Sequence, residues 1–307
     1  MKTNQVLLQT DLPLPPFIKG KVRDTYILSD KLLIVASDRI SAFDVVLPCG
    51  IPGKGWVLNQ LSAFWFKKTA HLVPNHLVEV LEDVSRLDAY LPPEKRFAYP
   101  YYLAGRSMVV KKVRRLPLEC IVRGYISGSA WAEYRKHGTV SGMPLPKGLL
   151  QSQQLPQPIF TPSTKGEGSE HDRPMTNKEV GDLLGRPLAR EVEQKSLELY
   201  SFARSYAAER GIIIADTKFE FGLDGDELIL IDEALTPDSS RFWDAALYKV
   251  GEAQDSYDKQ PVRDWLEATG WNKQLPAPML PEEVIESTAR RYLTAYERLT
   301  GEKLPNV

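Results

Sequence analysis

Two apolar runs in the last third of the chain, joined by an Asp-Gly turn signal, constrain the fold more than any other feature. The first reads GIIIADTKFEFG over residues 211–222, and the second reads ELILIDE over residues 227–233. Apolar runs that flank Asp-Gly predict a β-hairpin, because the turn requires positive φ. Side chains alternate along a strand, so Asp216, Lys218 and Glu220 share one face. This charged face predicts an ion or phosphate site or, equally well, the solvated face of an edge hairpin.

A polar segment with turn chemistry follows the hairpin. Residues 234–244 read ALTPDSSRFWD, in which Pro sets φ and Asp or Ser can hydrogen-bond nearby backbone. Arg241 lies beside Phe242 and Trp243, which can anchor the segment. Loops held on a rigid hairpin commonly grip ligands, so this segment is a candidate ligand loop.

Composition excludes several classes of function. The chain has 307 residues, 43% of them hydrophobic and 26% charged, which indicates one large or two ordinary globular domains. A formal net charge of −1 argues against bulk binding to nucleic acid or an anionic membrane. The first residues lack the apolar stretch of a secretory signal, and no apolar run is long enough to span a bilayer. We therefore expect a cytoplasmic protein.

Cysteine and histidine patterns favour neither a disulfide framework nor a zinc site. Cys49 and Cys120 have no CxxC or Cys/His neighbour, so we expect two buried thiols in a reducing cytosol. The four histidines show no zinc-ligand spacing.

Periodicity predicts an α+β fold whose first half consists mostly of strands. We expect a hairpin from residues 24–28 and 31–36, and a second strand pair from residues 106–113 and 118–126. Apolar residues at helical spacing predict one helix at 55–68, and a second, shorter helix is expected at 129–136.

The second half is expected to be mixed. Residues 141–175 are rich in Pro, Gly, Ser and Gln, which predicts a long extended connection with a functional or disordered role. Two helices follow it, one from Pro187 to Gly211 and one from Pro281 to Gly301, each with Pro at its start and Gly past its end.

A basic turn precedes the first hairpin. Gly20 is surrounded by Lys19, Lys21 and Arg23, an arrangement in which backbone N–H groups can approach a phosphate while the cations neutralise it. The pattern is not a Walker loop, and a solvated hairpin end would look the same.

Two further segments place polar residues at strand ends. Asp38 and Ser41 lie in a polar loop after an apolar strand, a common ligand position that is also typical of a surface turn. Arg123 ends another apolar strand, where its burial would be awkward without an anion. The following Ser127-Gly-Ser129 opens a helix, whose free N–H groups favour phosphate, although a serine N-cap explains the serines alone.

Together these segments resemble the SAICAR synthetase (phosphoribosylaminoimidazole-succinocarboxamide synthase) family. LPLECIVRGYISGS over residues 116–129 and IADTKFEFG over 214–222 are similar to its two characteristic segments. GKVRD, SDRISAFD and DEALTPDSSR at 20–24, 37–44 and 232–241 match in the same order. Many members have Thr or Ala where this chain has Ser127.

The resemblance implies an ATP- and Mg²⁺-dependent ligase. It would join L-aspartate to the carboxylate of carboxyaminoimidazole ribonucleotide through an acyl phosphate, giving SAICAR, ADP and phosphate in purine biosynthesis. It also implies two lobes: a β-rich, kinase-like ATP-binding lobe at 1–115, and a mixed α/β lobe with the substrate site at 116–307.

The resemblance also implies roles for individual residues. Lys218 would face the reacting carboxylate, with Asp238 on the substrate beside it as a second catalytic residue. ATP would be bound by Gly20, Lys21, Arg23 and Glu119, and Mg²⁺ by Glu220 and Asp232. The ribonucleotide would be bound by Asp38, Ser41, Arg123, Ser129 and Arg241. Among these, Arg123, Ser129 and Arg241 would contact its 5′-phosphate.

The residue types suit such a reaction, because phosphoryl transfer needs cations, a metal and alignment rather than a protein nucleophile. A small-molecule kinase using the same ATP lobe and a nucleotide-binding module without turnover are the alternatives. We further expect the strand at 108–113 to contact the adenine.

The hairpin register decides which acid accompanies Glu220. With a tight two-residue loop, opposed residue numbers sum to an odd number and Glu220 shares its face with Glu233. An odd-length loop or a bulge brings Asp232 to that face instead. Since the family match favours Asp232, we predict a bulge or odd-length loop between Gly222 and Glu227.

Overall fold

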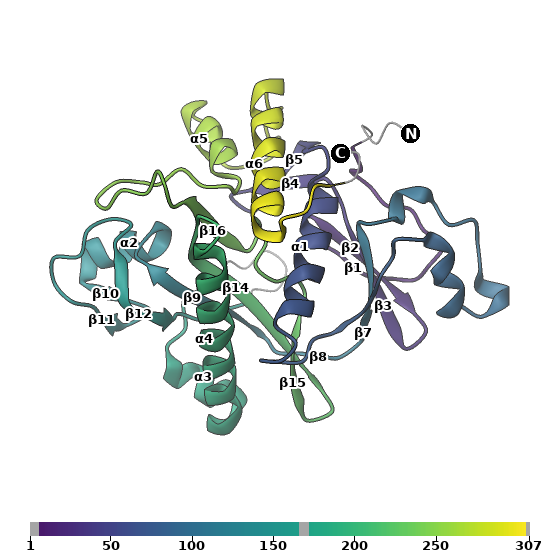
Figure 1. Cartoon of the computed structure of the whole chain (residues 1–307), viewed down its shortest axis with the longest axis horizontal. Helices are drawn as coiled ribbons and strands as arrows, with labels where there is room; N and C mark the ends of the chain where they lie inside the picture. Colours follow the sequence, from purple (N-terminus) through teal and green to yellow (C-terminus); the bar gives the residue numbers. More distant parts are fainter. Residues whose placement is uncertain (1–5, 166–171, 305–307) are drawn as a thin grey trace.

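The computed structural model describes residues 6–165 and 172–304, and these form an α+β fold built on two antiparallel sheets (Figure 1). The first sheet has five strands in the order β1-β2-β3-β7-β6. Its strands are β1 (Pro16–Lys19), β2 (Arg23–Leu28), β3 (Lys31–Ala36), β7 (Ser107–Lys111) and β6 (Leu77–Val80).

The second sheet has seven strands and a central strand, β14, which carries the charged face predicted from the sequence. The order β12-β9-β14-β15 forms its main path, and three short strands pair with β9 or β14 at its margins. Its strands are β12 (Gln154–Phe160), β9 (Leu118–Tyr125), β14 (Ile212–Asp224), β15 (Glu227–Ile231), β8 (Arg114–Arg115), β13 (Ser163–Thr164) and β16 (Ser240–Asp244). Two separate hairpins are β4 (Arg39–Ala42) with β5 (Val45–Gly50) and β10 (Thr139–Val140) with β11 (Met143–Pro144).

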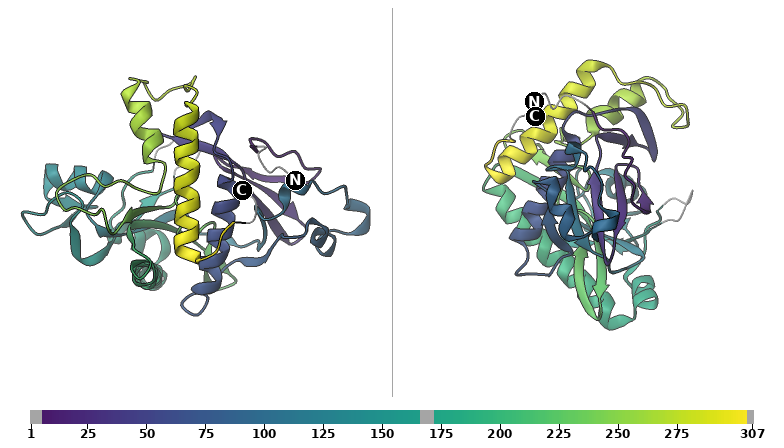
Figure 2. Two further views of the ribbon diagram at one scale, coloured as in Figure 1. Left: turned by 45° about the horizontal axis from the view of Figure 1, so that its top comes forward. Right: turned by 90° about the vertical axis from the view of Figure 1, so that its right-hand side faces the viewer.

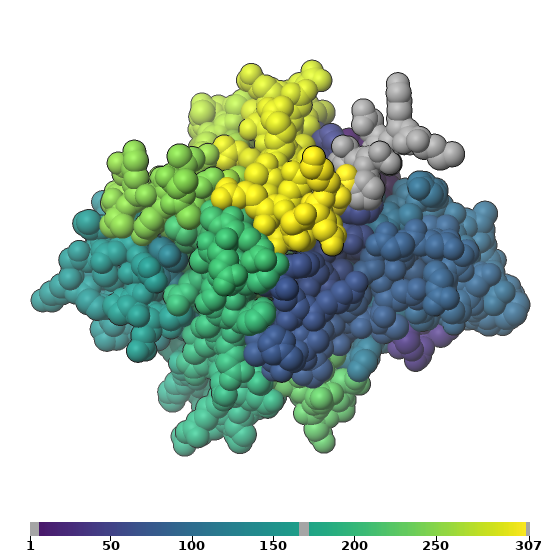
Figure 3. Space-filling model, viewed as in Figure 1, coloured from purple at the N-terminus to yellow at the C-terminus, as the bar shows by residue number. Residues whose placement is uncertain are grey.

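Helices α1, α4 and α6 lie on one side of the purple strands of the first sheet, as the right-hand view of Figure 2 shows. Helix α4 packs on β9, β12 and β14, whereas α1 packs on β3, β6 and β7 and against α6. Figure 3 shows α6 lying directly against α1 and α4. The α-helices are α1 (Lys54–Lys68), α2 (Gly128–His137), α3 (Asn177–Leu184), α4 (Arg186–Ala208), α5 (Gln260–Ala268) and α6 (Glu282–Thr300), and the 3₁₀-helices are Val84–Ala89, Pro93–Lys95 and Tyr101–Leu103.

One apolar core joins the two sheets. Ile34 and Val110 of the first sheet and Phe219 of the second belong to the same cluster as Trp65 and Phe66 of α1, and both of these α1 aromatics are fully buried. Burial of apolar side chains of this size contributes about 2–3 kcal/mol each, so α1 is a principal link between the sheets.

The predicted hairpin of β2 and β3, the helix α1 and the two long C-terminal helices are confirmed. The short helix α2 is also present. Helix α6 ends as predicted at Gly301, which adopts the left-handed conformation with φ 77°. Helix α4 ends at Ala208, earlier than expected, because the turn to β14 requires the residues up to Gly211.

One expectation about strand pairing is wrong. The strands at 107–111 and 118–125 do not pair, because the first pairs with β3 and β6 and the second with β12, β13 and β14. The connection at 141–175, of which residues 166–171 lie outside the described residues, contains the extended strand β12, which pairs with β9. Its prolines are tolerated because β12 is an edge strand.

The two cysteines, Cys49 and Cys120, are free and buried, as expected. Within the described ranges, no helix has both the length and the apolar character needed to cross a membrane.

Candidate functional site

A cavity of about 1040 Å³ gathers residues from both sheets and from α5. Its walls include strands β1, β2, β3 and β7 on one side, and the charged face of β14 with the segment after β15 on the other. Nine of the residues singled out from the sequence line it: Gly20, Lys21, Arg23, Ser41, Glu119, Lys218, Glu220, Asp232 and Asp238.

The basic turn between β1 and β2 has a conformation that requires glycine. The Gly20 N–H donates to the Arg23 carbonyl oxygen at 2.8 Å, and a Cβ at Gly20 would lie 2.8 Å from that oxygen. Lys21 points to an exposed ion pair with Asp44 at 2.6 Å. The turn therefore brings its backbone close to the cavity, as a phosphate loop must.

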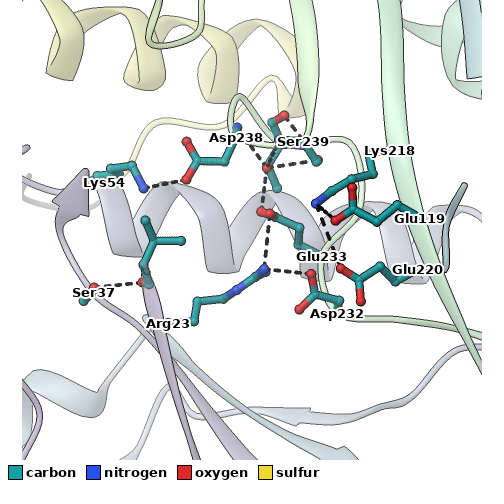
Figure 4. Close-up of polar contacts among 12 residues, drawn as sticks. Arg23, Ser37, Lys54, Glu119, Lys218, Glu220, Asp232, Glu233, Asp238 and Ser239 are labelled. Carbon is teal, nitrogen blue, oxygen red and sulfur yellow. Dashed lines mark hydrogen bonds and ion pairs between the residues drawn. The ribbon is translucent and has the colours of Figure 1, made fainter. Parts of the chain in front are cut away.

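Arg23 faces two acids of the second sheet rather than open space (Figure 4). Its Nη2 lies 2.7 Å from Asp232 Oδ2 and 3.3 Å from Glu233 Oε1. Burial acts to lower the pKa of Arg23, but the two carboxylates outweigh it and raise that pKa. Thr236 also donates to Glu233 at 2.7 Å, so Glu233 is held by two partners.

The predicted bulge or odd-length loop in the β14–β15 hairpin is wrong. Asp224 pairs with Glu227 across a two-residue loop, and the ladder continues regularly to the pair of Glu220 with Ile231. The rule that a two-residue loop places Glu233 on the face of Glu220 applies only within the strand. It does not extend to Asp232, which has a φ of 69° and follows the end of β15 at Ile231. Asp tolerates this left-handed conformation, which ends the strand alternation and lets Asp232 and Glu233 both reach the same arginine.

Lys218 occupies the middle of the charged face. Its Nζ lies 2.6 Å from Glu119 Oε1 and 4.0 Å from Glu220 Oε1. Burial acts to lower the pKa of Lys218, but Glu119 and Glu220 outweigh it and raise that pKa, so the ammonium stays charged. A charged donor at this position can hold a carboxylate without giving up its proton.

The carboxylates of Glu220 and Asp232 repel each other. Burial raises the pKa of Glu220, and the nearby Asp232 raises it further, despite an ion pair with Lys165. Burial also acts to raise the pKa of Asp232, but Arg23 and the neighbouring lysines outweigh it and lower that pKa to about 2. Two buried carboxylates in this state fit a divalent cation with hard oxygen ligands.

Within residues 6–165 and 172–304, no group of three or more His, Cys, Asp or Glu side chains is arranged to hold a metal. Mg²⁺ usually takes one or two carboxylates, with waters and substrate phosphates completing its shell. Glu220 and Asp232 provide two carboxylates, the number of protein ligands that such a site uses.

Asp238 is buried at the other end of the cavity. It accepts from Lys54 Nζ at 2.7 Å and from the Tyr292 hydroxyl at 2.6 Å, and Lys259 Nζ lies 3.9 Å away. Burial acts to raise the pKa of Asp238, but Lys54, Lys259 and the two hydrogen bonds hold it well below its usual range. Asp238 is thus a permanent anion held in a fixed orientation.

Arg123, Ser129 and Arg241 meet outside the cavity lining, around Asp216. Arg123 Nη1 lies 3.1 Å from Asp216 Oδ2, and Nη2 donates to Ser129 Oγ at 3.4 Å. Arg241 forms an ion pair with the same Asp216 oxygen. Asp216 is the anion that makes burial of Arg123 tolerable, and a single carboxylate oxygen of Asp216 contacts both guanidinium groups.

The start of α2 completes this cluster. Gly128 has a φ of 55°, and a Cβ there would lie 2.4 Å from Arg241 Nη2, so any other residue would displace the guanidinium group. The buried Ser127 Oγ has no hydrogen-bond partner among the described residues. An anion bound at this helix start would find free N–H groups, two arginines and two serines.

Asp38 lies outside the cavity lining and has a structural environment. Its fully buried carboxylate accepts from the backbone N–H groups of Leu7 at 2.8 Å and Gly55 at 2.9 Å, and it pairs with Arg106 at 2.9 Å. These contacts fix the start of α1. Nothing in this arrangement leaves Asp38 facing a substrate.

Sequence reasoning missed several cavity residues. Lys165, Lys259, Arg263 and His76 line the cavity, and Lys54 supports Asp238. A Gly-Lys-Gly sequence at the start of α1 was the only local signal for Lys54. Val110, Lys111 and Val113 from the expected adenine strand also line the cavity, and adenine binding there stays a prediction.

A second cavity, of about 590 Å³, lies near the N-terminal segment. Its charged wall residues Asp24 and Arg39 pair with each other at 2.8 Å, and Thr10 donates to Asp24 at 2.6 Å. Because these polar groups already have hydrogen-bond partners, this cavity has fewer groups available to bind a ligand than the first cavity.

The SAICAR synthetase family model matches residues 16–278. The chain belongs to the SAICAR synthetase family. It is 52% identical to the phosphoribosylaminoimidazole-succinocarboxamide synthase of Syntrophotalea carbinolica over 97% of this chain and 99% of the relative. It is 53% identical to the synthase of Methylobacillus flagellatus over 92% and 93% of the two chains.

Solved structures of SAICAR synthetases share the fold. The structure of the Saccharomyces cerevisiae SAICAR synthase complexed with SAICAR has a TM-score of 0.88 and 48% identity, covering 97% of this chain and 99% of that chain. A SAICAR synthetase in complex with ADP has a TM-score of 0.65 and 26% identity, covering 94% and 99%. The predicted α+β fold of this family is confirmed.

Proposed function

We propose that the 1040 Å³ cavity is where this SAICAR synthetase carries out its reaction. The chain is an ATP-dependent ligase of purine biosynthesis that joins L-aspartate to the carboxylate of carboxyaminoimidazole ribonucleotide, releasing ADP and phosphate. The observation that carries the proposal is that one cavity combines a glycine turn, a charged buried Lys218 and the acid pair Glu220 and Asp232.

A carboxylate is a poor acyl donor, so its oxygen must first become a leaving group. In the proposed sequence, the ribonucleotide carboxylate attacks the γ-phosphorus of ATP, and ADP leaves. The amine of L-aspartate, after losing a proton, then attacks the acyl carbon, and phosphate leaves with the oxygen. Such chemistry depends on positioning and on stabilisation of negative charge rather than on a protein nucleophile.

Lys218 would hold the reacting carboxylate and stabilise the charge that develops on its oxygens. Its raised pKa supports this role over that of a base. Glu119, 2.6 Å away, would orient the ammonium from the ATP side. Gly20, Lys21 and Arg23 would lie over the ATP phosphates, with Arg23 also holding the acids after β15.

Glu220 and Asp232 would hold the Mg²⁺ that accompanies ATP. When bound, this ion neutralises phosphate charge and aligns the transferred group. The mutual repulsion of the two carboxylates supports the assignment, because a cation between them relieves it. Lys165, which pairs with Glu220, would then have to change partner.

Arg123, Arg241 and Ser129 would bind the 5′-phosphate of the ribonucleotide at the start of α2. The support is the shared Asp216, the unpartnered Ser127 hydroxyl and the glycine that admits Arg241. Ser41 would contact the same substrate, whereas the environment of Asp38 favours a structural role.

The division into an ATP lobe at 1–115 and a substrate lobe at 116–307 stays a prediction. A cytosolic location is also proposed, and the two free thiols support it.

An isotope experiment tests the mechanism. With ¹⁸O in the ribonucleotide carboxylate, one labelled oxygen should appear in the released phosphate, and amide product should require L-aspartate. Unlabelled phosphate would overturn the acyl phosphate. A kinase would give a phosphorylated product independent of aspartate, and a binding module would release no ADP.

A further inference from the structure

His76 is a buried imidazole in the wall of the main cavity, and none of the steps described above uses it. Only 3% of its surface is exposed, and its Nε2 has no hydrogen-bond partner among the described residues. Burial lowers the pKa of His76 to about 4, although the Asp232 carboxylate and a hydrogen bond to the Asp232 backbone both act to raise it. The ring is therefore an uncharged group whose one polar contact is with the residue after β15.

The segment that carries His76 joins the two sheets and fixes the position of the ring. The His76 N–H donates to the Leu230 carbonyl oxygen on β15 at 3.0 Å, and the His76 carbonyl oxygen accepts from the Lys111 N–H at the end of β7 at 2.8 Å. The imidazole packs edge-to-face on Phe66 of α1, with 5.2 Å between the ring centroids. Because Leu230 lies two residues before Asp232, the ring and the end of β15 are held in one frame.

Asp232 adopts a backbone conformation that needs support from its surroundings. Its φ of 69° is uncommon for a residue with a Cβ atom, and such a conformation persists only where neighbouring contacts hold it. Arg23 holds the carboxylate at 2.7 Å, but an ion pair to a side-chain oxygen does not fix the peptide group that follows Asp232. The backbone of Asp232 therefore requires a partner of its own.

The imidazole of His76 supplies this partner. A ring N–H donates, so the backbone atom that it contacts is the Asp232 carbonyl oxygen, and because Nε2 has no partner, the donor is Nδ1. A hydrogen bond to this carbonyl fixes ψ of Asp232, and φ and ψ together set the direction of its side chain. Figure 4 shows the resulting position of the Asp232 carboxylate, beside Glu220 and Arg23.

We propose that His76 is a positioning residue for the acid pair: its Nδ1–H holds the Asp232 carbonyl oxygen, and this contact aims the Asp232 carboxylate at the place where Glu220 also points. The proposal rests on the proposed function, in which these two acids hold Mg²⁺. Partners that orient a metal ligand through a hydrogen bond affect metal affinity although they do not touch the ion. A role in packing against Phe66 alone is the alternative.

Binding of Mn²⁺ to the enzyme with ADP, followed by electron paramagnetic resonance, tests the proposal without turnover. Mn²⁺ is suitable because it shares the preference of Mg²⁺ for oxygen ligands. His76→Leu removes the donor and should weaken Mn²⁺ binding about 3- to 10-fold, the effect of one neutral hydrogen bond. His76→Asn keeps an N–H near the position of Nδ1 and should bind Mn²⁺ within about twofold of the wild type.

His71→Leu is the matched control. His71 is exposed and packs edge-to-face on Phe202, also with 5.2 Å between the ring centroids, but it lies outside the cavity lining. This variant should bind Mn²⁺ like the wild type. The KM for the ribonucleotide should stay within about twofold of the wild type in all three variants, because the proposed contact concerns the metal ligand only.

Nitrogen-15 spectra of the wild-type enzyme give a second readout that needs no variant of His76. The chain has four histidines, so variants of His71, His137 and His171 assign the His76 signals by elimination. At pH 7.5, Nδ1 should carry the proton and Nε2 should be unprotonated. A proton on Nε2 alone would overturn the proposal, because Nδ1 would then be unable to donate to the Asp232 carbonyl oxygen.

Wild-type affinity for Mn²⁺ in folded His76→Leu would also overturn the proposal. Equal losses in His76→Leu and His76→Asn would show that ring packing, rather than the hydrogen bond, sets the affinity. Failure of the underlying metal assignment is distinguished by Glu220→Gln and Asp232→Asn. If both bind Mn²⁺ like the wild type, the acid pair does not hold the ion; if both bind weakly while His76→Leu does not, only the role of His76 is wrong.

Discussion

Removal of the buried Lys54 ammonium should destabilise the fold in a strongly pH-dependent way. The side chain is 0% exposed and its partner Asp238 is 5% exposed, with 2.7 Å between Nζ and Oδ2. Lys54→Met keeps the volume but leaves Asp238 without its closest cation. Breaking a buried pair in this way costs about 3–5 kcal/mol in the free energy of unfolding. For a chain of 307 residues, the melting temperature should fall by roughly 5–8 °C at pH 8.

The pH dependence separates this mechanism from a simple packing defect. In the wild type, the pKa of Asp238 is lowered, so its contribution is present above the unfolded pKa of about 3.9 and is lost as the pH falls through the folded pKa. In Lys54→Met, burial persists without the strongest opposing charge, and the pKa of Asp238 should rise. Protonation of Asp238 then removes the cost of burying an unpaired carboxylate. The difference in the free energy of unfolding between wild type and variant should therefore be smaller at pH 5 than at pH 8.

Thermal and guanidinium unfolding at both pH values measure the effect. The double variant Lys54→Met with Asp238→Asn removes both members of the 2.7 Å ion pair, with Lys259 left at the edge of this position, and should recover part of the loss. A deficit under 1 kcal/mol, a deficit that is equal at both pH values, or a double variant less stable than Lys54→Met would refute the reasoning.

Further substitutions address the phosphate cluster and the acid pair. Arg241→Lys should raise the ribonucleotide KM about 10- to 100-fold with little change for ATP, since a point charge cannot replace a bidentate fork; equal losses for both ligands would indicate misfolding. Gly128→Ala should weaken binding of the ribonucleotide, because the added methyl group displaces Arg241. An unchanged KM for the ribonucleotide would contradict the proposed anion site. Glu220→Gln and Asp232→Asn should raise the Mg²⁺ concentration needed for half-maximal rate and nearly abolish turnover. Glu233→Gln should do much less, and the opposite ranking in a Mg²⁺ titration would assign Glu233 to the metal.

Local signals predicted the elements that depend on local chemistry. The hairpin of β2 and β3 follows from two apolar runs around a short turn, and the end of α6 follows from Gly301. The pairing of strands did not follow, because the partner of β9 is chosen by the topology of the whole sheet. The prolines of β12 indicated a loop, although an edge strand accommodates them equally well.

The site shows the same division. The shared face of Lys218 and Glu220 follows from strand alternation and could be predicted. The position of Asp232 could not, since it depends on one positive φ beyond the end of β15. The contacts of Lys54 and Lys259 depend on how α1, α5 and α6 pack, and no short sequence pattern encodes that packing.

Strand β14 also fixes the distances between the groups of the site. Asp216 at the arginine cluster, Lys218 and Glu220 occupy alternate positions of one strand, at a spacing of about 3.4 Å per residue. The anion cluster and the acid pair are therefore separated along the strand by about 13 Å, a length that the hydrogen-bonded neighbours β9 and β15 prevent from changing. In the proposed function, the 5′-phosphate of the ribonucleotide lies at the arginine cluster and its carboxylate lies at Lys218, so β14 would fix the distance between these two groups. Free imidazole carboxylate and inorganic phosphate could occupy the same two positions, but without a covalent link between them the carboxylate would not be held in place for reaction.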